Sequence, residues 1–420
     1  MLDITFLVRD LVFFLLIALG VILLTRRLSI PYTLGLVVVG LLLSLFGLLP
    51  EAHLSPPLVL FVFLPALLFE GAWTISLQRL RQNWQAIFLL AGPGMLLSLV
   101  LIASMLYLFD GLDWGTAFLL AAILSPTDPV AVLSLFRQLR VNEQLSTIIE
   151  GESLFNDGVA GSLYQTFLAV VLLSLHGQAS TGVQAWLEGA GLFALEAGGG
   201  ILLGGACGWG VSWMVKRIDD PLIETTITII VAYGVYLLAD TLHLSGILAV
   251  IVAGLILGSY GRTRGMSEPT RAAVDTFWST LAFIANALIF LLVGIELNPL
   301  SILSHPAESG PTILIVLLAI GVVLLARLLL VLALAARSRG RHFPAPIPHA
   351  WSLVIFWSGL RGALSLALVL AIPLEVPRRP TLLISTYAVV FFTLLIQGFS
   401  LRGLLKQRED ADFIGLKLLS

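Results

Sequence analysis

Charged side chains are scarce in this sequence. Only 11% of its 420 residues are Asp, Glu, Lys or Arg, whereas 58% are hydrophobic. A soluble domain carries about 25% charged residues, so the composition excludes an ordinary soluble fold and favours a lipid bilayer as solvent. The net charge of −2 and the lack of a basic cluster give no support for a nucleic-acid partner.

Residues that serve redox, metal or phosphate chemistry are also missing. Cys207 is the single cysteine, which rules out a disulfide framework and leaves no metal-ligand spacing. The six histidines fall in or near predicted loops and form no ligand pair. The glycines between residues 198 and 210 lack the Gly-Lys-Ser/Thr ending of a phosphate loop, and we expect them to serve close helix packing. We therefore expect no cofactor, and an intramembrane enzyme is disfavoured.

Long apolar runs are abundant instead. A transmembrane helix needs about 20 mostly apolar residues, and this rule predicts an all-α polytopic membrane protein with about thirteen spans, numbered here in chain order. The predicted spans cover 5–25, 30–48, 57–76, 84–109, 115–136, 144–174, 186–215, 222–241, 244–259, 274–297, 311–335, 348–372 and 381–404.

The distribution of Lys and Arg gives an independent test of this count, because cytoplasmic loops hold the excess of these residues. With thirteen spans, eighteen of the 23 basic residues fall on one side and only Arg378 and Arg379 on the other. The remaining three, Arg9, Arg327 and Arg361, lie inside spans. We therefore expect the N-terminus outside and the C-terminus in the cytoplasm, with 405–420 as a short cytoplasmic tail.

The fifth span contains two prolines around a carboxylate, in the run from Ser125 to Pro129. Each proline removes a backbone donor and clashes with the carbonyl four residues before it, so the carbonyls of Ala122 and Ser125 lose their usual partners. Asp128 precedes a proline and is disfavoured in the α region. A simple kink is the alternative, but we predict two half-helices, which at membrane depth line cavities and offer carbonyls to ions.

The sixth span carries a second polar cluster, from Glu150 to Asp157. Helical spacing puts Ser153 and Asp157 on one face and Glu152 with Asn156 on a neighbouring face, so Glu152 and Asp157 point about 140° apart. Their oxygens are hard ligands suited to a small alkali cation, and a carboxylate also binds a proton. Competition between Na⁺ and H⁺ for one carboxylate is itself a mechanism of exchange. A merely polar helix face is the alternative interpretation.

Two arginines lie in the middle of later spans. Arg327 keeps its proton at any accessible pH and needs a carboxylate. Glu152 is the expected partner, because Asp157 must stay free for the ion, although Arg327 could instead extend to the helix end. Arg361 is flanked by two glycines in span 12, which indicates a second interruption.

The positions of the two interruptions suggest an internal symmetry. If spans 1–6 and 8–13 are inverted repeats, span 5 corresponds to span 12, the pairing expected where two discontinuous helices cross at a midplane site. Asp128 would then compensate the positive partial charge at the N-termini of the half-helices, and Arg361 the negative partial charge at their C-termini. Glu70, Glu196 and Asp240 also lie at or within spans, and the sequence leaves structural, solvated and entrance roles open for them.

Three motifs together resemble those of the NhaP-type sodium/proton antiporters, relatives of the animal sodium/proton exchangers. They run from Thr127 to Val132, from Gly151 to Asp157 and from Gly359 to Ala363, in the family's order. The resemblance implies an NhaA-like antiporter fold and a homodimer in the lipid bilayer of a plasma membrane. It also implies a transport core (84–174 and 311–404, spans 4–6 and 11–13) and dimerisation or scaffold helices (1–83 and 186–297).

The resemblance also implies roles for single residues. Asp157 is expected to carry either Na⁺ or H⁺, with Thr127 and Ser153 as further Na⁺ ligands and Asn156 orienting the site. Three roles repeat those inferred above: Glu152 pairs with Arg327, and Asp128 and Arg361 compensate the broken helices. Pro126 stands where many members have alanine.

An asparagine before the carrier aspartate is typical of electroneutral members of that family. The implied function is therefore secondary active exchange of one Na⁺, or Li⁺, for one H⁺ by alternating access. Exchange of K⁺ for H⁺ is an alternative, since oxygen ligands alone do not fix ion size. A passive cation channel is the alternative from another class.

Overall fold

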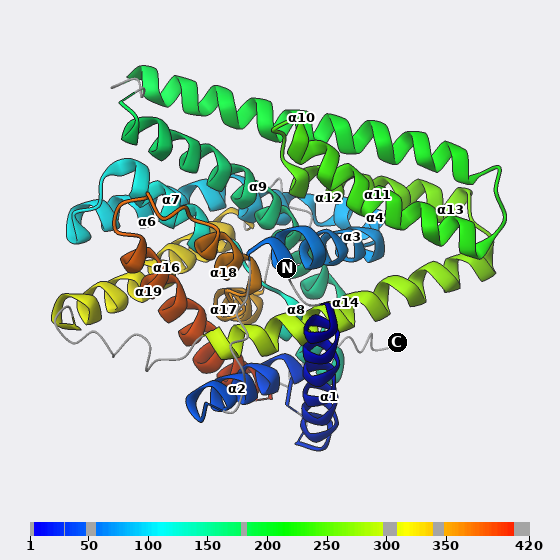
Figure 1. Cartoon of the computed structure of the whole chain (residues 1–420), viewed down its shortest axis with the longest axis horizontal. Coiled ribbons are helices and arrows are strands. Elements are labelled where there is room, and N and C mark those ends of the chain that lie inside the picture. The colour runs from blue at the N-terminus through cyan, green and yellow to red at the C-terminus, as the bar shows by residue number, and fades with distance from the viewer. Residues whose placement is uncertain are drawn as a thin grey trace.

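The structure is a computed structural model that describes residues 4–28, 30–47, 56–177, 183–296, 309–338 and 348–406. Most of the long helices in this part of the chain run along a common direction (Figure 1). Nine of the described helices are long and apolar enough to cross a membrane, and shorter apolar helices lie among them. The chain is thus a multi-pass membrane protein.

The first six predicted spans all fall on helices. They correspond to α1 (Ile4–Leu28), α2 (Tyr32–Leu45), η1 with α3 (Leu58–Phe63, Leu64–Thr74), α5 with η2 and α6 (Trp84–Leu89, Leu90–Gly94, Met95–Asp110), α7 with α8 (Trp114–Leu124, Val130–Leu139) and α9 (Glu143–Leu175). The η elements are π-helical turns within a continuous span, and α4 (Leu77–Gln82) is a short helix between spans 3 and 4.

The seventh predicted span is α10 (Val183–Val215), and the last six also fall on helices. They correspond to α11 (Pro221–Thr241), α12 with η3 and α13 (Gly246–Ile256, Leu257–Gly261, Arg262–Arg264), α14 (Glu268–Glu296), α16 (Ser309–Ser338), α17 with α18 (His349–Trp357, Ala363–Leu370) and α19 with η5 and α20 (Arg379–Phe391, Phe392–Gln397, Gly398–Lys406). All thirteen predicted spans therefore fall on helices of the described residues, nine of them long enough to cross a membrane. Most of the predicted tail, 407–420, lies outside the described residues.

Polar caps fix where several spans begin. The Asp113 carboxylate accepts a hydrogen bond from the N–H of Thr116 at 3.0 Å at the start of α7. The Asn142 side chain caps α9 in the same way, and Asp220 caps α11. Such side chains satisfy backbone donors that have no partner inside the helix, which sets the register of the spans that carry the polar clusters.

Glycines bring α10 into close contact with α12. A side chain at Gly204 would overlap the carbonyl of Ala249, and one at Gly208 would lie 3.0 Å from the backbone of Ala253. Only glycine permits this approach, so the predicted packing role is confirmed for these two glycines. It does not hold for every glycine of the run, because a Cβ atom at Gly210 would meet nothing within 4 Å. In Figure 1, α10 runs along the edge of the molecule, with α11 and α12 between it and the remaining helices.

The helices form two packed groups. In one, α6, α7, α9, α16, α18 and α19 contact one another; in the other, α2, α3, α10, α11, α12 and α14 do so. Contacts of α9 with α10 and α12, and of α14 with α18, join the groups. Both interrupted spans belong to the first group, so the polar breaks are surrounded by protein on most sides.

Candidate functional site

The two interrupted spans cross at their breaks. Residues 125–129 are not helical and join α7 to α8, and residues 358–362 join α17 to α18 in the same way. The backbone N–H of Asp128 donates to the carbonyl oxygen of Leu360 at 2.8 Å, which links the two segments directly. The simple kink is therefore wrong, and the predicted pair of crossed, discontinuous helices is confirmed.

Arg361 reaches from the second break to the end of α7. Its Nη1 donates to the carbonyl of Ser125 and, at 2.7 Å, to that of Pro126. Its backbone N–H donates to Oγ1 of Thr393 at 3.1 Å. The C-terminal end of a helix carries a negative partial charge, so the guanidinium stabilises the freed carbonyls. Neither the carbonyl of Pro126 nor the hydroxyl of Thr393 was predicted from the sequence as a partner of Arg361.

Asp128 lies at the opposite half-helix ends. Its Oδ1 accepts from the N–H of Val130, at the start of α8, at 3.0 Å. The N–H of Ala363, at the start of α18, also donates to this carboxylate. One carboxylate thus lies at two helix N-termini, whose positive partial charge favours an anion.

Gly362 is the residue that lets this carboxylate approach α18. A Cβ atom at position 362 would overlap the Asp128 carboxylate. We expect Gly362→Ala to destabilise the protein by about 1–3 kcal/mol, the usual cost of overpacking, and to reduce transport because it displaces Asp128. Gly321→Ala is the matched control, since a Cβ atom there meets nothing within 4 Å. Thermal unfolding followed by tryptophan fluorescence would measure both, and equal stability of the two variants would contradict the prediction.

Arg327 and Glu152 form a buried ion pair, with exposed fractions of 5% and 1%. Nη1 contacts Oε1 of Glu152 and Nη2 lies 3.0 Å from Oε2, so the pairing is bidentate. Nε and Nη2 also donate to the carbonyl of Ile355 at 3.2 and 2.9 Å. This is the pair that the sequence predicted, and the alternative in which Arg327 extends to the helix end is wrong. Gly359 leaves room for the guanidinium, because a Cβ atom there would lie 3.0 Å from Nε.

The remaining predicted site residues meet around the first break. The hydroxyl of Ser153 donates to the backbone carbonyl of Thr127. Nδ2 of Asn156 lies 3.4 Å from Oγ1 of Thr127 and 3.4 Å from Oε1 of Glu152. Ser153 therefore faces the carbonyl of Thr127, while the hydroxyl of Thr127 faces Asn156. Among the described residues, Oδ1 of Asn156 is buried without a hydrogen-bond partner.

A cavity of about 1400 Å³ leads to Asp157. Its wall on α9 consists of residues that recur at helical spacing on one face: Ser146, Glu150, Ser153, Leu154 and Asp157. Its wall on α14 likewise follows one face: Asp275, Thr276, Ser279, Ala282, Phe283 and Asn286. Both walls end midway along their helices, although α9 continues to Leu175 and α14 to Glu296. The cavity thus opens toward one end of the bundle and closes at the level of Asp157.

Several polar residues of this wall were not assigned from the sequence. Glu70 on α3 lines the cavity. Arg137 on α8 and Asn286 on α14 also line it. Asn286 could have been noticed as a single amide in the apolar run of span 10. Hydropathy alone, however, does not reveal which face of a helix lines a cavity.

Comparison with known families decides the classification. A family model described as "Sodium/hydrogen exchanger, transmembrane" matches residues 14–407. The chain belongs to this family. Among sodium/hydrogen exchangers, it is 39% identical over 381 residues to the Na⁺/H⁺ antiporter ApNhaP of Aphanothece halophytica, covering 90% of this chain and 70% of that protein. It is also 39% identical over 353 residues to the Na⁺/H⁺ antiporter NhaP of Pseudomonas aeruginosa, covering 82% and 80%.

A solved structure gives the same fold. The sodium/proton antiporter MjNhaP1 of Methanocaldococcus jannaschii matches with a TM-score of 0.74 at 21% identity, covering 96% of this chain and 98% of that one. The antiporter fold that the family resemblance implied is therefore confirmed.

Proposed function

We propose that this exchanger moves Na⁺ and H⁺ in opposite directions across a plasma membrane, with Asp157 as the carrier of either ion. One observation carries the proposal: Asp157 lies at the closed end of the cavity on the same face of α9 as Ser153, whose hydroxyl faces the freed carbonyl of Thr127. Membership of the sodium/hydrogen exchanger family and the names of its relatives support the choice of ions.

The oxygens at the end of the cavity suit a dehydrated alkali cation. A cation beside Asp157 lies between the Ser153 hydroxyl and the carbonyl of Thr127: the hydroxyl keeps its proton but turns it away, the hydrogen bond breaks, and both oxygens become ligands. When the cation leaves, the carboxylate takes a proton and the hydrogen bond re-forms. Glu152 does not compete for the cation, because Arg327 occupies both of its oxygens.

The neighbour of the carrier sets the stoichiometry. Asn156 precedes Asp157, so a single carboxylate at this point binds either one cation or one proton. Each half-cycle then moves one positive charge, in opposite directions, and the exchange is electroneutral. The ion gradients supply the driving force, and no ATP or cofactor is required.

Alternating access requires the carrier to move relative to a fixed frame. We assign residues 84–174 and 311–404 to the moving transport core, and residues 1–83 and 186–297 to the scaffold. The two packed groups of helices support this division. The cavity lies along the boundary, since α8 and α9 line one side of it and α3 and α14 the other.

The cavity opens to the cytoplasm in this proposal. Arg26, Arg137, Arg262 and Arg402 line it, and all four belong to the side with the excess of basic residues. The N-terminus is then outside and the C-terminus inside, and the structure represents the inward-open state of the cycle.

A homodimer formed through the scaffold completes the proposal. Of the nine long spans, α10 has the smallest buried share within the chain, 17%. Its exposed large apolar side chains include those of Leu202, Trp209 and Trp213. A second copy covering this helix would bury an extended apolar surface and anchor the scaffold while the core moves.

Proteoliposomes test the function directly. The protein is reconstituted with a pH gradient, and Na⁺, Li⁺ or K⁺ is added while a fluorescent dye reports the internal pH. We expect Na⁺, and to some degree Li⁺, to dissipate the gradient. A response to K⁺ alone would replace Na⁺ by K⁺ as the substrate, and cation flux without coupled proton movement would favour the channel.

Clamping the membrane potential in the same vesicles tests the stoichiometry. Valinomycin with equal K⁺ on both sides holds the potential at zero. We expect the rate of Na⁺-driven proton movement to be the same with and without the clamp. A rate that rises when the clamp is applied would show net charge movement and would contradict exchange of one Na⁺ for one H⁺.

A further inference from the structure

Two side-chain hydrogen bonds join the proposed core to the proposed scaffold beyond the closed end of the cavity. The hydroxyl of Tyr387 on α19 donates to Oε1 of Glu296 on α14 at 3.2 Å. The hydroxyl of Thr166 on α9 lies 3.1 Å from Oε2 of Glu196 on α10 and 3.0 Å from the carbonyl of Ser162. It can donate its proton to either of these two acceptors. In both, a neutral hydroxyl of the core meets a carboxylate of the scaffold.

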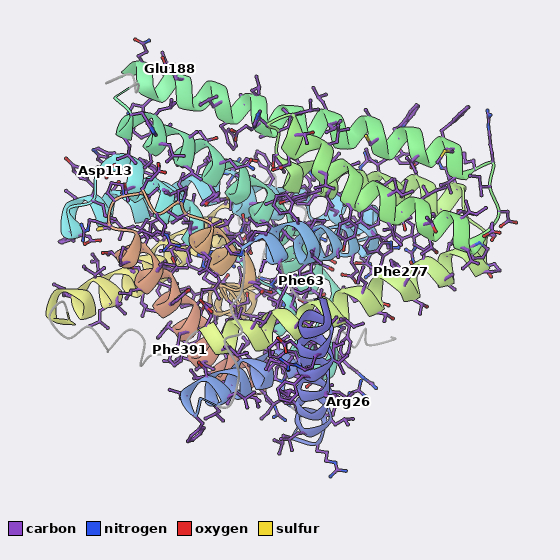
Figure 2. The ribbon with its side chains drawn as sticks, viewed as in Figure 1. Arg26, Phe63, Asp113, Glu188, Phe277 and Phe391 are labelled. Carbon is purple, nitrogen blue, oxygen red and sulfur yellow. The ribbon has the colours of Figure 1, made fainter. Side chains whose placement is uncertain are left out.

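Both bonds lie on the far side of the carrier from the cavity. Glu296 follows Asn286, the last cavity residue on α14, by about 15 Å at a rise of 1.5 Å per residue. Thr166 follows Asp157 by about 14 Å along α9 on the same basis. The far end of the bundle is the one at which Figure 2 labels Asp113 and Glu188, near the starts of α7 and α10.

A buried polar group lies between the carrier and these bonds. Tyr164 follows Asp157 by two helical turns and so lies on the same face of α9. Its hydroxyl is buried and has no hydrogen-bond partner among the described residues. Tyr164 belongs to a buried cluster of side chains against which Tyr387 also packs. A buried hydroxyl without a partner is unfavourable, and opening this side to water would remove that cost.

We propose that the Tyr387–Glu296 and Thr166–Glu196 hydrogen bonds form the outer gate of the transport path, which runs past Tyr164. The proposal rests on the exchange function and on the movement of core against scaffold. With both bonds formed the outer path is closed, as in this structure. When the core moves, both bonds break and the path from Asp157 to the outside opens.

The chemistry of the two acceptors suits a cation path. Glu196 and Glu296 stay with the scaffold when the bonds break, so two carboxylates then face the open path and attract cations entering from outside. When the gate closes, each carboxylate again accepts from its hydroxyl, Glu196 from Thr166 and Glu296 from Tyr387. The position of the core thus determines whether the carboxylates of Glu196 and Glu296 face the outer path.

Removing one hydroxyl should shift the equilibrium from the state with a closed outer path toward the outward-open state. Tyr387→Phe deletes the donor to Glu296 and keeps the ring. Because a hydrogen bond to a charged acceptor is worth at least about 1.4 kcal/mol, we expect the outward-open population to rise about tenfold. Tyr233→Phe is the matched control: its hydroxyl donates to the carbonyl of Val62 at 2.9 Å, but both residues belong to the scaffold.

A cysteine at position 164 reports on the outer path. Tyr164→Cys is introduced together with Cys207→Ser, and a membrane-impermeant maleimide is added from outside. We expect labelling to be about tenfold faster with Tyr387→Phe, unchanged with Tyr233→Phe, and faster still when Thr166→Val is added to Tyr387→Phe. Equal rates with Tyr387→Phe and Tyr233→Phe would overturn the gate.

Side-specific transport kinetics provide a second measurement if the reporter variant does not fold. In the otherwise unsubstituted protein, Tyr387→Phe should lower the apparent KM for Na⁺ on the outer face and raise it on the cavity face. Unchanged KM values on both faces, with exchange intact, would overturn the gate while leaving the exchange function in place. Absence of exchange in the unsubstituted protein would overturn the exchange function and the gate with it.

Discussion

Asp157→Asn is expected to abolish cation-driven proton movement while the protein still folds. The amide keeps the size of the carboxyl group and its place on α9, but it neither carries a proton in exchange nor offers a negative charge to a cation. Since the proposal routes both ions through this one group, no residual exchange is expected. Dissipation of a pH gradient in proteoliposomes measures the loss, and thermal unfolding confirms that the variant is folded.

Glu143→Gln is the matched control for this variant. Glu143 is the first residue of α9, and its carboxylate forms an exposed ion pair with Arg79 at 2.8 Å. The same kind of substitution on the same helix should leave exchange unchanged. Exchange at a normal rate in Asp157→Asn would remove this residue as the carrier.

Glu152→Gln is expected to produce the largest loss of stability. The substitution leaves the guanidinium of Arg327 buried without its carboxylate, although the carbonyl of Ile355 remains as an acceptor. Breaking a buried ion pair by removing one partner costs roughly 3–5 kcal/mol. We expect a clear fall in the thermal unfolding temperature of the purified protein.

The exposed pair again supplies the control. Side-chain exposures of 50% for Arg79 and 75% for Glu143 place that ion pair in solvent, where such pairs contribute about 0–1 kcal/mol. Glu143→Gln should therefore change the unfolding temperature little. If Glu152→Gln were as stable as Glu143→Gln, the buried ion pair would not stabilise the protein as expected.

The breaks in spans 5 and 12 could be predicted because their causes are local. Pro126 and Pro129 remove backbone hydrogen-bond donors whatever the tertiary packing around them. Arg361, which lies in a span between two glycines, indicates a second irregular segment. The partner of Arg327 could also be predicted, since an arginine in the membrane requires a carboxylate and few were available. These inferences needed composition and spacing, and no knowledge of the packing.

Other features of the site depend on how distant helices pack. Glu70 and Asn286 line the cavity only because α3 and α14 turn those faces toward α8 and α9. The resemblance gave Thr127 as a ligand without saying which oxygen, and it is the carbonyl that faces Ser153. The acceptors of Tyr387 and Thr166 lie 91 and 30 residues away in the chain, so periodicity within single spans carried no sign of them.

Proton release on cation binding tests the central claim most directly. The purified protein is titrated with NaCl in weakly buffered solution, with choline chloride as the ionic-strength control, and the released protons are counted with a pH indicator. If Asp157 holds either Na⁺ or H⁺, Na⁺ should displace protons from the unsubstituted protein, up to one per protomer, and none from Asp157→Asn. Saturable Na⁺ binding without proton release, or the same release from Asp157→Asn, would contradict a shared carrier.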